Sequence, residues 1–289
     1  MAKNELVLMN TFHIPSRYEG VDEELLEELK DELADLDEEN GISCRIIKIP
    51  SGGGMAYEVQ GDEDDDVEYM KEVSGVIVFT HRMNAYWEGK YGESPDEGAK
   101  IPYCSSMDGK TGLCTESGEI LTCEGCPYNQ YGSDLQGGKG KACKNMRRIY
   151  LMMDNDPNFY LLTVPPTSIK DVNKRLARIM GSKGIPYTQL IVSFKLEKAI
   201  NAGGIAYSKI ILETKGLLPA ESAAVARQMR NQIKEKYKEL AITADDYNAP
   251  PTYRNPAEVV VDDAEFSEVI GSDDEVPPFM DAPAQQGNV

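Results

Sequence analysis

The chain has 289 residues, of which 30 are Lys or Arg and 49 are Asp or Glu, so its formal net charge is −19. An apolar fraction of 41% suffices for a buried core, yet no run of eighteen apolar residues occurs that would span a bilayer. The amino-terminal segment lacks the basic and apolar regions of a secretory signal, so we expect a soluble cytoplasmic protein with reduced cysteines.

The first part of the chain combines short strands with one acidic helix. Residues 6–9 are a predicted strand, and residues 21–39 are a predicted amphipathic helix because leucines recur there at helical spacing. Residues 43–49 and 75–80 are further predicted strands, with glycines and an acidic loop at 61–66 between them.

Beyond a cysteine-rich insert, the pattern predicts two hairpins. Residues 147–153 and 158–164 are apolar runs separated by an Asp-Asn-Asp-Pro turn. Residues 189–196 and 205–212 form the second pair of strands. Because hairpins and interposed helices do not alternate regularly, the predicted fold class is α+β rather than a doubly wound sheet.

Two helices are expected between and after these hairpins. The first is capped by Thr167 or Ser168 and ends near Gly181 or Gly184. The second begins after Pro219 and runs to about residue 240.

The domain prediction is one body, residues 1–244, with an insert at about 100–146. Residues 245–289 are rich in Pro, Asp, Glu, Ala and Gln without periodicity, so they are predicted to form a disordered acidic tail.

The cysteine-rich insert carries the most specific chemical signal. Five of the six cysteines fall within forty residues, namely Cys104, Cys114, Cys123, Cys126 and Cys143. The two-residue gap in Cys-Glu-Gly-Cys is that of a zinc knuckle, where glycine lets the backbone turn so that both thiolates face one ion. Surface thiols or a redox pair are the alternatives, but neither accounts for five cysteines together.

We therefore predict one structural Zn²⁺ bound by Cys104, Cys123, Cys126 and Cys143. Cys114 is an alternative to either outer ligand. Four thiolates close the coordination sphere, which excludes a zinc-activated water.

Two segments resemble known proteins. Residues 271–279, GSDDEVPPF, resemble the acidic tip of bacterial single-stranded-DNA-binding proteins, although ten residues follow Phe279 here. The block CSSMDGKTG, CEGCPYNQYGS and GKGKACKNMRRIYLM resembles phage-encoded single-stranded-DNA-binding proteins. Zinc with an acidic tail is also similar to the T-even phage helix-destabilising protein, so the resemblance implies an oligonucleotide-binding-type β-barrel elaborated with helices.

This resemblance implies a phage protein in the bacterial cytoplasm that protects single-stranded DNA during replication, recombination or repair. Its tail would recruit polymerase, primase or helicase. The predicted partner-binding residues are Asp273, Asp274, Glu275, Pro278 and Phe279.

The charge distribution agrees with a nucleic-acid ligand. Residues 100–240 contain 21 basic and 13 acidic residues, residues 1–99 contain 8 and 25, and residues 241–289 contain 1 and 11. A positive middle between acidic flanks predicts a basic surface and a tethered competitor for it. An ordinary acidic protein with lysine-bearing helices is the alternative.

A nonspecific single-strand binder needs cations along a groove and aromatic rings on which bases stack. The predicted DNA-binding residues combine both kinds of side chain: Trp87, Tyr128, Tyr131, Lys139, Lys141, Lys144, Arg147, Arg148, Lys174 and Arg178. Lysines of the second hairpin, such as Lys195 and Lys209, extend this set. Core packing is the alternative for each aromatic residue.

Catalytic motifs are absent from the sequence. There is no Gly-x-Ser-x-Gly, no His-Glu-x-x-His and no Walker loop, so an enzyme is not expected. Two other functions remain open. One is a zinc-stabilised regulator that acts through protein contacts, and the other is a metal-dependent nuclease that uses the acidic amino-terminal region.

Overall fold

The computed structural model describes residues 6–15, 20–35, 44–61, 66–87, 102–134, 139–200 and 206–238. Its helices are α1 (Glu23–Asp35), α2 (Pro166–Lys183) and α3 (Ala220–Lys236), with short 3-10 turns η3 (Pro127–Asn129) and η4 (Tyr187–Gln189). The strands are β1 (Cys44–Lys48), β2 (Tyr57–Gln60), β3 (Val67–Met70), β4 (Glu72–Tyr86), β5 (Cys104–Ser106), β6 (Thr111–Cys114), β7 (Ile120–Thr122), β8 (Lys144–Met152), β9 (Phe159–Val164), β10 (Leu190–Ile200) and β11 (Ala206–Leu217).

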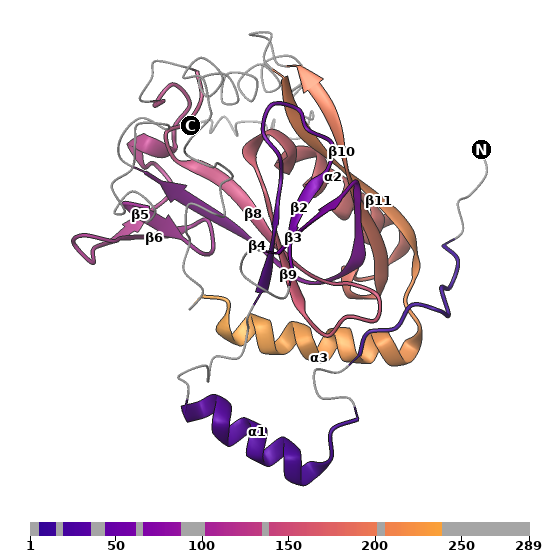
Figure 1. Ribbon diagram of the computed structural model, residues 1–289. Helices are drawn as coiled ribbons and strands as arrows, with labels where there is room; N and C mark the ends of the chain where they lie inside the picture. Colours follow the sequence, from indigo (N-terminus) through magenta and orange to yellow (C-terminus); the bar gives the residue numbers. More distant parts are fainter. Residues whose placement is uncertain are drawn as a thin grey trace, which may run out of the picture.

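All of these strands belong to one branched sheet organised by the long strand β4 (Figure 1). On one edge, β4 pairs with β8, and the order continues through β9, β1, β2 and β3. On the other edge, its first five residues pair with β10 and its last three residues pair with β5. The cysteine-rich insert is therefore an extension of the sheet beyond the point where β10 and β11 leave it.

This architecture confirms the α+β prediction, but the sheet is open. In the described ranges, β3, β7 and β11 are ends at which the pairing stops, so the strands do not close into the barrel that the resemblance implied. The pairing of β1 with β9 is parallel, whereas the other strand pairs of the sheet are antiparallel.

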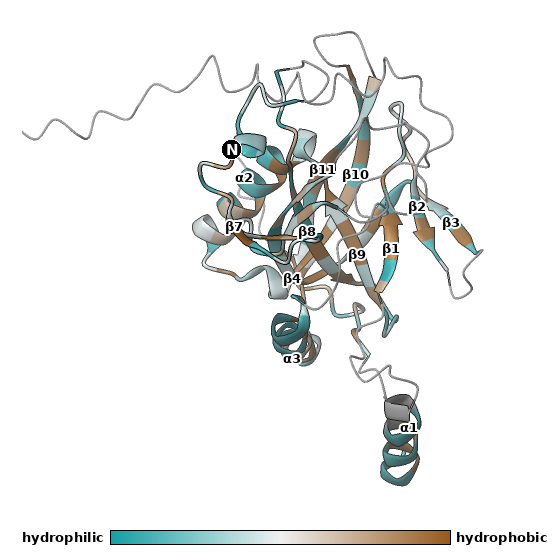
Figure 2. Ribbon diagram, turned by 90° about the vertical axis from the view of Figure 1, so that its left-hand side faces the viewer, coloured by the Kyte–Doolittle hydropathy of each residue, from teal (hydrophilic) through white to brown (hydrophobic). Residues whose placement is uncertain are grey.

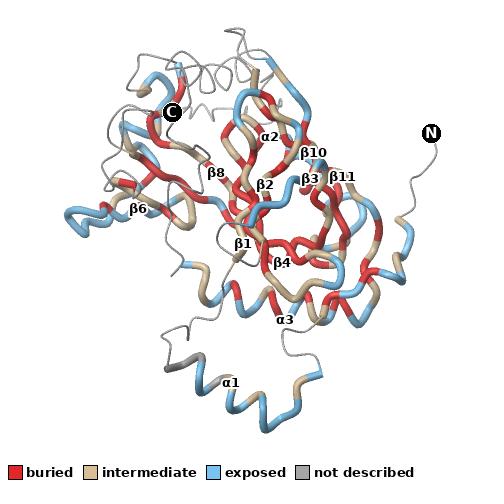
Figure 3. Tube along the Cα trace, in the orientation of Figure 1, coloured by how far each residue is buried: buried red, intermediate tan, exposed pale blue. Residues whose placement is uncertain are grey.

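Each face of the sheet is covered by one helix. On one face, Val172, Leu176 and Ile179 of α2 pack with alternate residues of β8 such as Ile149 and Leu151. On the opposite face, α3 packs against a second apolar cluster through residues that include Ala226 and Met229. Figure 2 shows the brown apolar strands between these helices, and Figure 3 shows the buried positions along β4.

Helix α2 ends where the sequence places a glycine, but it begins differently from the prediction. Gly184 has φ +66°, and its N–H donates to Met180 O at 2.9 Å, whereas Gly181 lies within the helix. At the start, Pro166 occupies the first helical position and no side chain caps the helix. The buried hydroxyl of Ser168 instead accepts a hydrogen bond from Ile210 N of β11 at 3.0 Å, which fixes the helix on the sheet.

The amino-terminal segment contributes one isolated bridge, between Leu8 and Leu217, rather than the predicted strand. The predicted acidic helix is confirmed as α1, which lies apart from the sheet (Figure 1). None of the helices in the described ranges has the length and apolarity needed to cross a membrane.

His81 on β4 is buried among aromatic rings. Its centroid lies 4.6 Å from that of Tyr237, 5.8 Å from that of Phe79 and 5.9 Å from that of Tyr150. Nδ1 lies 3.0 Å from the carbonyl oxygen of Arg82, which accepts a hydrogen bond from the ring when Nδ1 carries the proton.

Burial lowers the pKa of His81 to about 4, and the charge of Arg148 acts in the same direction. The unfolded chain takes up this proton near pH 6.5, so the neutral ring stabilises the fold above that pH, and this contribution is lost as the pH falls toward 4. We expect the loss to reach about 3 kcal/mol near pH 4. Urea unfolding at pH 7, 6 and 5 of the wild type and of His81→Gln measures it. An equally steep acid loss in the variant would contradict this assignment.

Candidate functional site

Four of the five clustered cysteines surround one pocket. Cys104 at the start of β5, Cys123 and Cys126 before η3, and Cys143 before β8 line a cavity of about 50 Å³. Gly112 completes the wall, because a Cβ added to it would lie 2.9 Å from Cys104 Sγ and 3.8 Å from Cys123 Sγ. The four residues predicted as zinc ligands are therefore brought together.

The thiols influence one another electrostatically. Burial raises the pKa of Cys143 to about 12 and that of Cys104 to about 11, and the neighbouring thiols add to both shifts. Within the part of the chain that the structure describes, no three His, Cys, Asp or Glu side chains are arranged as they stand to hold a metal ion. The four cysteines thus share one pocket, but their sulfurs do not have the close spacing of bound ligands.

Backbone hydrogen bonds give the Cys123–Cys126 segment the shape of a knuckle. Gly125 adopts φ +78°, and Cys126 N donates to Cys123 O at 3.4 Å, which closes a tight turn. Cys143 N donates to Tyr128 O at 2.8 Å, so the last thiol is tied to η3. These contacts place cysteines distant in the sequence around one point.

Cys114 occupies a different position. It pairs with Cys104 across β5 and β6, but it does not line the pocket. Hydrogen bonds with Ser117 lower the pKa of its thiol. The geometry therefore favours Cys143 over Cys114 as the fourth member of the cluster.

An amide network joins the thiol pocket to the main sheet. Asn145 Nδ2 of β8 donates to Asn84 Oδ1 of β4 at 2.8 Å and to Asn129 Oδ1 of η3 at 2.9 Å. Lys141 Nζ donates to Asn145 Oδ1 at 3.0 Å and lies 4.8 Å from the centre of the Tyr131 ring. Sequence reasoning missed these asparagines, although the two-residue spacing of Asn145 and Arg147 in a strand places both on one face.

Two predicted DNA-binding tyrosines lie beside this network. The ring of Tyr128 stacks on Tyr86 with centroids 4.3 Å apart and planes 16° apart. Tyr128 is nevertheless 42% exposed and Tyr131 is 41% exposed. Both rings therefore retain accessible surface at which a base can stack.

Strand alternation divides the basic run that follows the cysteines. We name the face of β4 and β8 that bears Thr80, Arg82, Asn84, Asn145 and Arg147 the Arg147 face. Arg147 Nη1 on this face donates to Thr80 Oγ1 at 3.1 Å. Residues at odd positions of β8 share this face, and even positions point to the other side of the sheet.

Three predicted DNA-binding residues lie on the opposite side. Trp87 packs against the cluster of Met83 and Met146, Lys144 Nζ donates to a backbone carbonyl, and Arg148 is only 1% exposed. A phosphate cannot reach Arg148 in this conformation. The run of cations that looks continuous in the sequence is therefore not one surface.

The cations of α2 are placed differently. Lys174 and Arg178 are exposed, and α2 lies on the same side of the sheet as the Arg147 face, since it packs against Ile149, two positions from Arg147. Lys139 is also exposed, at the start of the segment that leads to Lys141.

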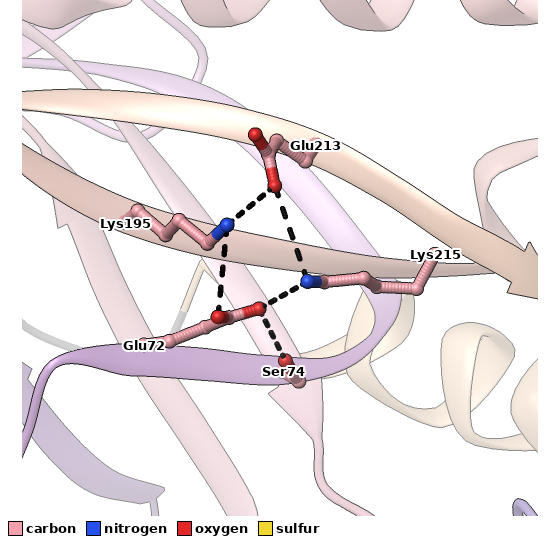
Figure 4. Close-up of polar contacts among 5 residues, drawn as sticks. All are labelled: Glu72, Ser74, Lys195, Glu213 and Lys215. Carbon is pink, nitrogen blue, oxygen red and sulfur yellow. Dashed lines mark hydrogen bonds and ion pairs between the residues drawn. The ribbon is translucent and has the colours of Figure 1, made fainter.

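The lysines of the second hairpin are engaged in ion pairs. Lys195 Nζ lies 2.8 Å from Glu213 Oε2 and 3.8 Å from Glu72 Oε2, and Lys215 Nζ lies 2.6 Å from Glu72 Oε1 (Figure 4). Lys209 Nζ lies 2.7 Å from a carboxylate oxygen of α2. These neutralised charges are poorly suited to bind phosphate, unlike those of Lys174 and Arg178.

The predicted partner-binding residues, Asp273 to Phe279, lie outside the described residues, as does the whole of 239–289. The described chain ends at Lys238. Burial raises the pKa of Asp108, but the hydrogen bonds that its carboxylate accepts from the backbone and from Ser106, together with the charge of Lys238, lower the pKa overall. Asp108 lies in the turn between β5 and β6, so the side chain of Lys238 lies near the cysteine-rich module.

Comparisons of the chain with protein-family models, with curated proteins and with solved structures give no match.

Proposed function

We propose that this protein binds single-stranded DNA on the Arg147 face and the adjoining tyrosines, as a binding protein without catalytic activity. The observation that supports the proposal is the grouping of Arg147 and Lys141 with two partly exposed tyrosines, Tyr128 and Tyr131. Cations that contact phosphates and rings that stack on bases are the two requirements of sequence-tolerant single-strand binding. The bound strand would lie on a curved open sheet rather than in a closed barrel.

The exposed cations Lys139, Lys174 and Arg178 extend this surface. We leave Trp87, Lys144 and Arg148 out of it, because they lie on the other side of the sheet. Duplex DNA binds less well in this proposal, since its bases are already stacked on one another and cannot reach the tyrosines.

We also propose that the four-cysteine pocket holds one structural Zn²⁺. The residues fit the ion, because four sulfur ligands are those of structural zinc sites and the cavity is larger than the space one water requires. Gly112 suits this position, since a Cβ there would lie only 2.9 Å from Cys104 Sγ and would displace that sulfur. When bound, zinc would fix the module that carries Tyr128 and Tyr131; Cys104, Cys123, Cys126 and Cys143 would be its ligands.

The test of DNA binding is a titration of labelled oligo(dT) and of a duplex of the same length at several salt concentrations. We expect tighter binding of the single strand and a linear fall of log K with log salt. Tyr131→Ala is expected to cost about 1 to 3 kcal/mol of binding free energy. Tyr69→Ala is the matched control, because Tyr69 is 69% exposed on β3 at the far end of the sheet.

Equal affinity for both forms, or no binding at low salt, would refute the proposal. Zinc binding without DNA binding would instead favour a regulator that acts through protein contacts.

A further inference from the structure

Arg82 and Arg147 form an unusual cross-strand pair. They are register partners in the antiparallel pairing of β4 with β8, so their side chains leave the same face of the sheet. Directly opposed residues have Cβ atoms about 5 Å apart, and like charges in this position are destabilising. A negative group near both guanidinium groups would remove this repulsion and stabilise the pair.

The residues that the structure describes do not supply that group. Within the described ranges, neither Arg82 nor Arg147 lies within ion-pair distance of a carboxylate. Arg147 Nε is buried and donates no hydrogen bond to any residue that the structure describes. The side-chain hydrogen bond of Arg147 is the one to Thr80, whose hydroxyl in turn donates to Arg148 O at 2.7 Å.

The positions of the two arginines suit an external ligand. Arg82 is exposed and Arg147 is half-buried, so the pair is open to solvent on one side and fixed on the other. Burial, together with the charge of Arg82, lowers the pKa of Arg147, which is the direction expected for a cation without a counter-charge. The β5–β6 turn packs against the stem of Arg82, because a Cβ added at Gly109 would lie 3.1 Å from Arg82 Cβ.

We propose that Arg82 and Arg147 clamp one phosphodiester group, with Thr80 orienting the guanidinium of Arg147. The planar fork of each guanidinium matches two phosphate oxygens, and the anion removes the repulsion between the two cations. Asn84 and Asn145 are the next register pair along the same face, where Asn145 Nδ2 donates to Asn84 Oδ1 beside the clamp. The identification of the anion as part of a DNA strand rests on the proposed function.

The clamp is tested by Arg82→Gln and Arg147→Gln, with Arg227→Gln as the matched control on the exposed side of α3. Each clamp variant is expected to weaken oligo(dT) binding and to flatten the slope of log K against log salt by about 0.7, and the control leaves both unchanged. Arg82→Lys keeps the charge but loses the planar guanidinium. We therefore expect it to have the salt slope of the wild type but a lower affinity for oligo(dT).

A second measurement separates binding from folding. Because removal of one like charge relieves repulsion, Arg82→Gln is expected to keep or raise the thermal transition of the free protein while it weakens DNA binding. A lower transition temperature with unchanged DNA affinity shows a structural arginine and overturns the clamp.

The clamp and the proposed function fail in different ways. If the wild type binds oligo(dT) and both clamp variants bind it with the same slope, the clamp is wrong and the function stands. If the wild type does not bind oligo(dT), pyrophosphate is the probe. A rise in the thermal transition that Arg82→Gln abolishes then supports the clamp alone, and no rise overturns both.

Discussion

Replacement of Cys123 by serine is expected to remove zinc from the purified protein and to unfold residues 102–143. The module has little apolar core of its own, since its buried cluster consists of Tyr86, Ala142 and Cys143. Zinc-binding free energy is folding free energy in such modules and amounts to about 10 kcal/mol or more. Elemental analysis of protein purified without added metal, followed by limited proteolysis, measures both effects.

The matched control is Cys44→Ser. Cys44 is half-buried on β1 and packs against the cluster under α3, away from the pocket. We expect this variant to keep one zinc per chain. Cys114→Ser tests the alternative ligand, and it should also keep the metal because Cys114 lies outside the pocket. A metal-free wild type with an intact module would contradict the zinc proposal.

Truncation before residue 271 is expected to tighten single-strand binding, most strongly at low salt, and to abolish co-purification with polymerase, primase or helicase. Residues 241–289 carry eleven acids and one Arg, and the truncation removes four of these acids, Asp273, Asp274, Glu275 and Asp281. A tethered segment competes at an effective concentration on the millimolar scale, and salt screens the competition. Zinc content and the thermal transition should stay unchanged.

Point variants separate the two roles of this tail. Phe279→Ala keeps every charge, so we expect loss of the partners with unchanged DNA affinity. Asp273→Asn with Asp274→Asn removes part of the competitor, so tighter DNA binding is expected there. Titrations at low and high salt, with pull-downs of polymerase, primase and helicase from a bacterial lysate, measure these effects. If truncation unfolds the body or abolishes DNA binding, the tail belongs to the fold and this account is wrong.

The sequence predicted local structure best where backbone chemistry acts over a few residues. The Asp-Asn-Asp-Pro turn does join a hairpin, β8 with β9, and Gly184 ends α2 in the left-handed conformation. It predicted the helix start less well. Ser168 has a hydroxyl that could cap the helix, but this hydroxyl instead accepts a hydrogen bond from a buried backbone N–H of β11.

Long-range pairing could not be read from the pattern. The predicted strand at 75–80 is the centre of β4, a fifteen-residue strand that pairs with β8, β10 and β5. Periodicity reports which residues are buried, but it does not identify the partner on either edge or show whether the sheet closes. For this reason the sequence could not show that the sheet is open and branched rather than closed into a barrel.

The sequence by itself determined the composition of the candidate site: which cysteines cluster, where the cations gather and where the acids follow. The tertiary structure decided which of them act together. Cys104 and Cys143 are 39 positions apart and meet because β5 and β8 both pair with β4. Arg147 and Arg148 are adjacent in the chain, yet strand alternation sends them to opposite faces, where one meets Arg82 and the other is buried.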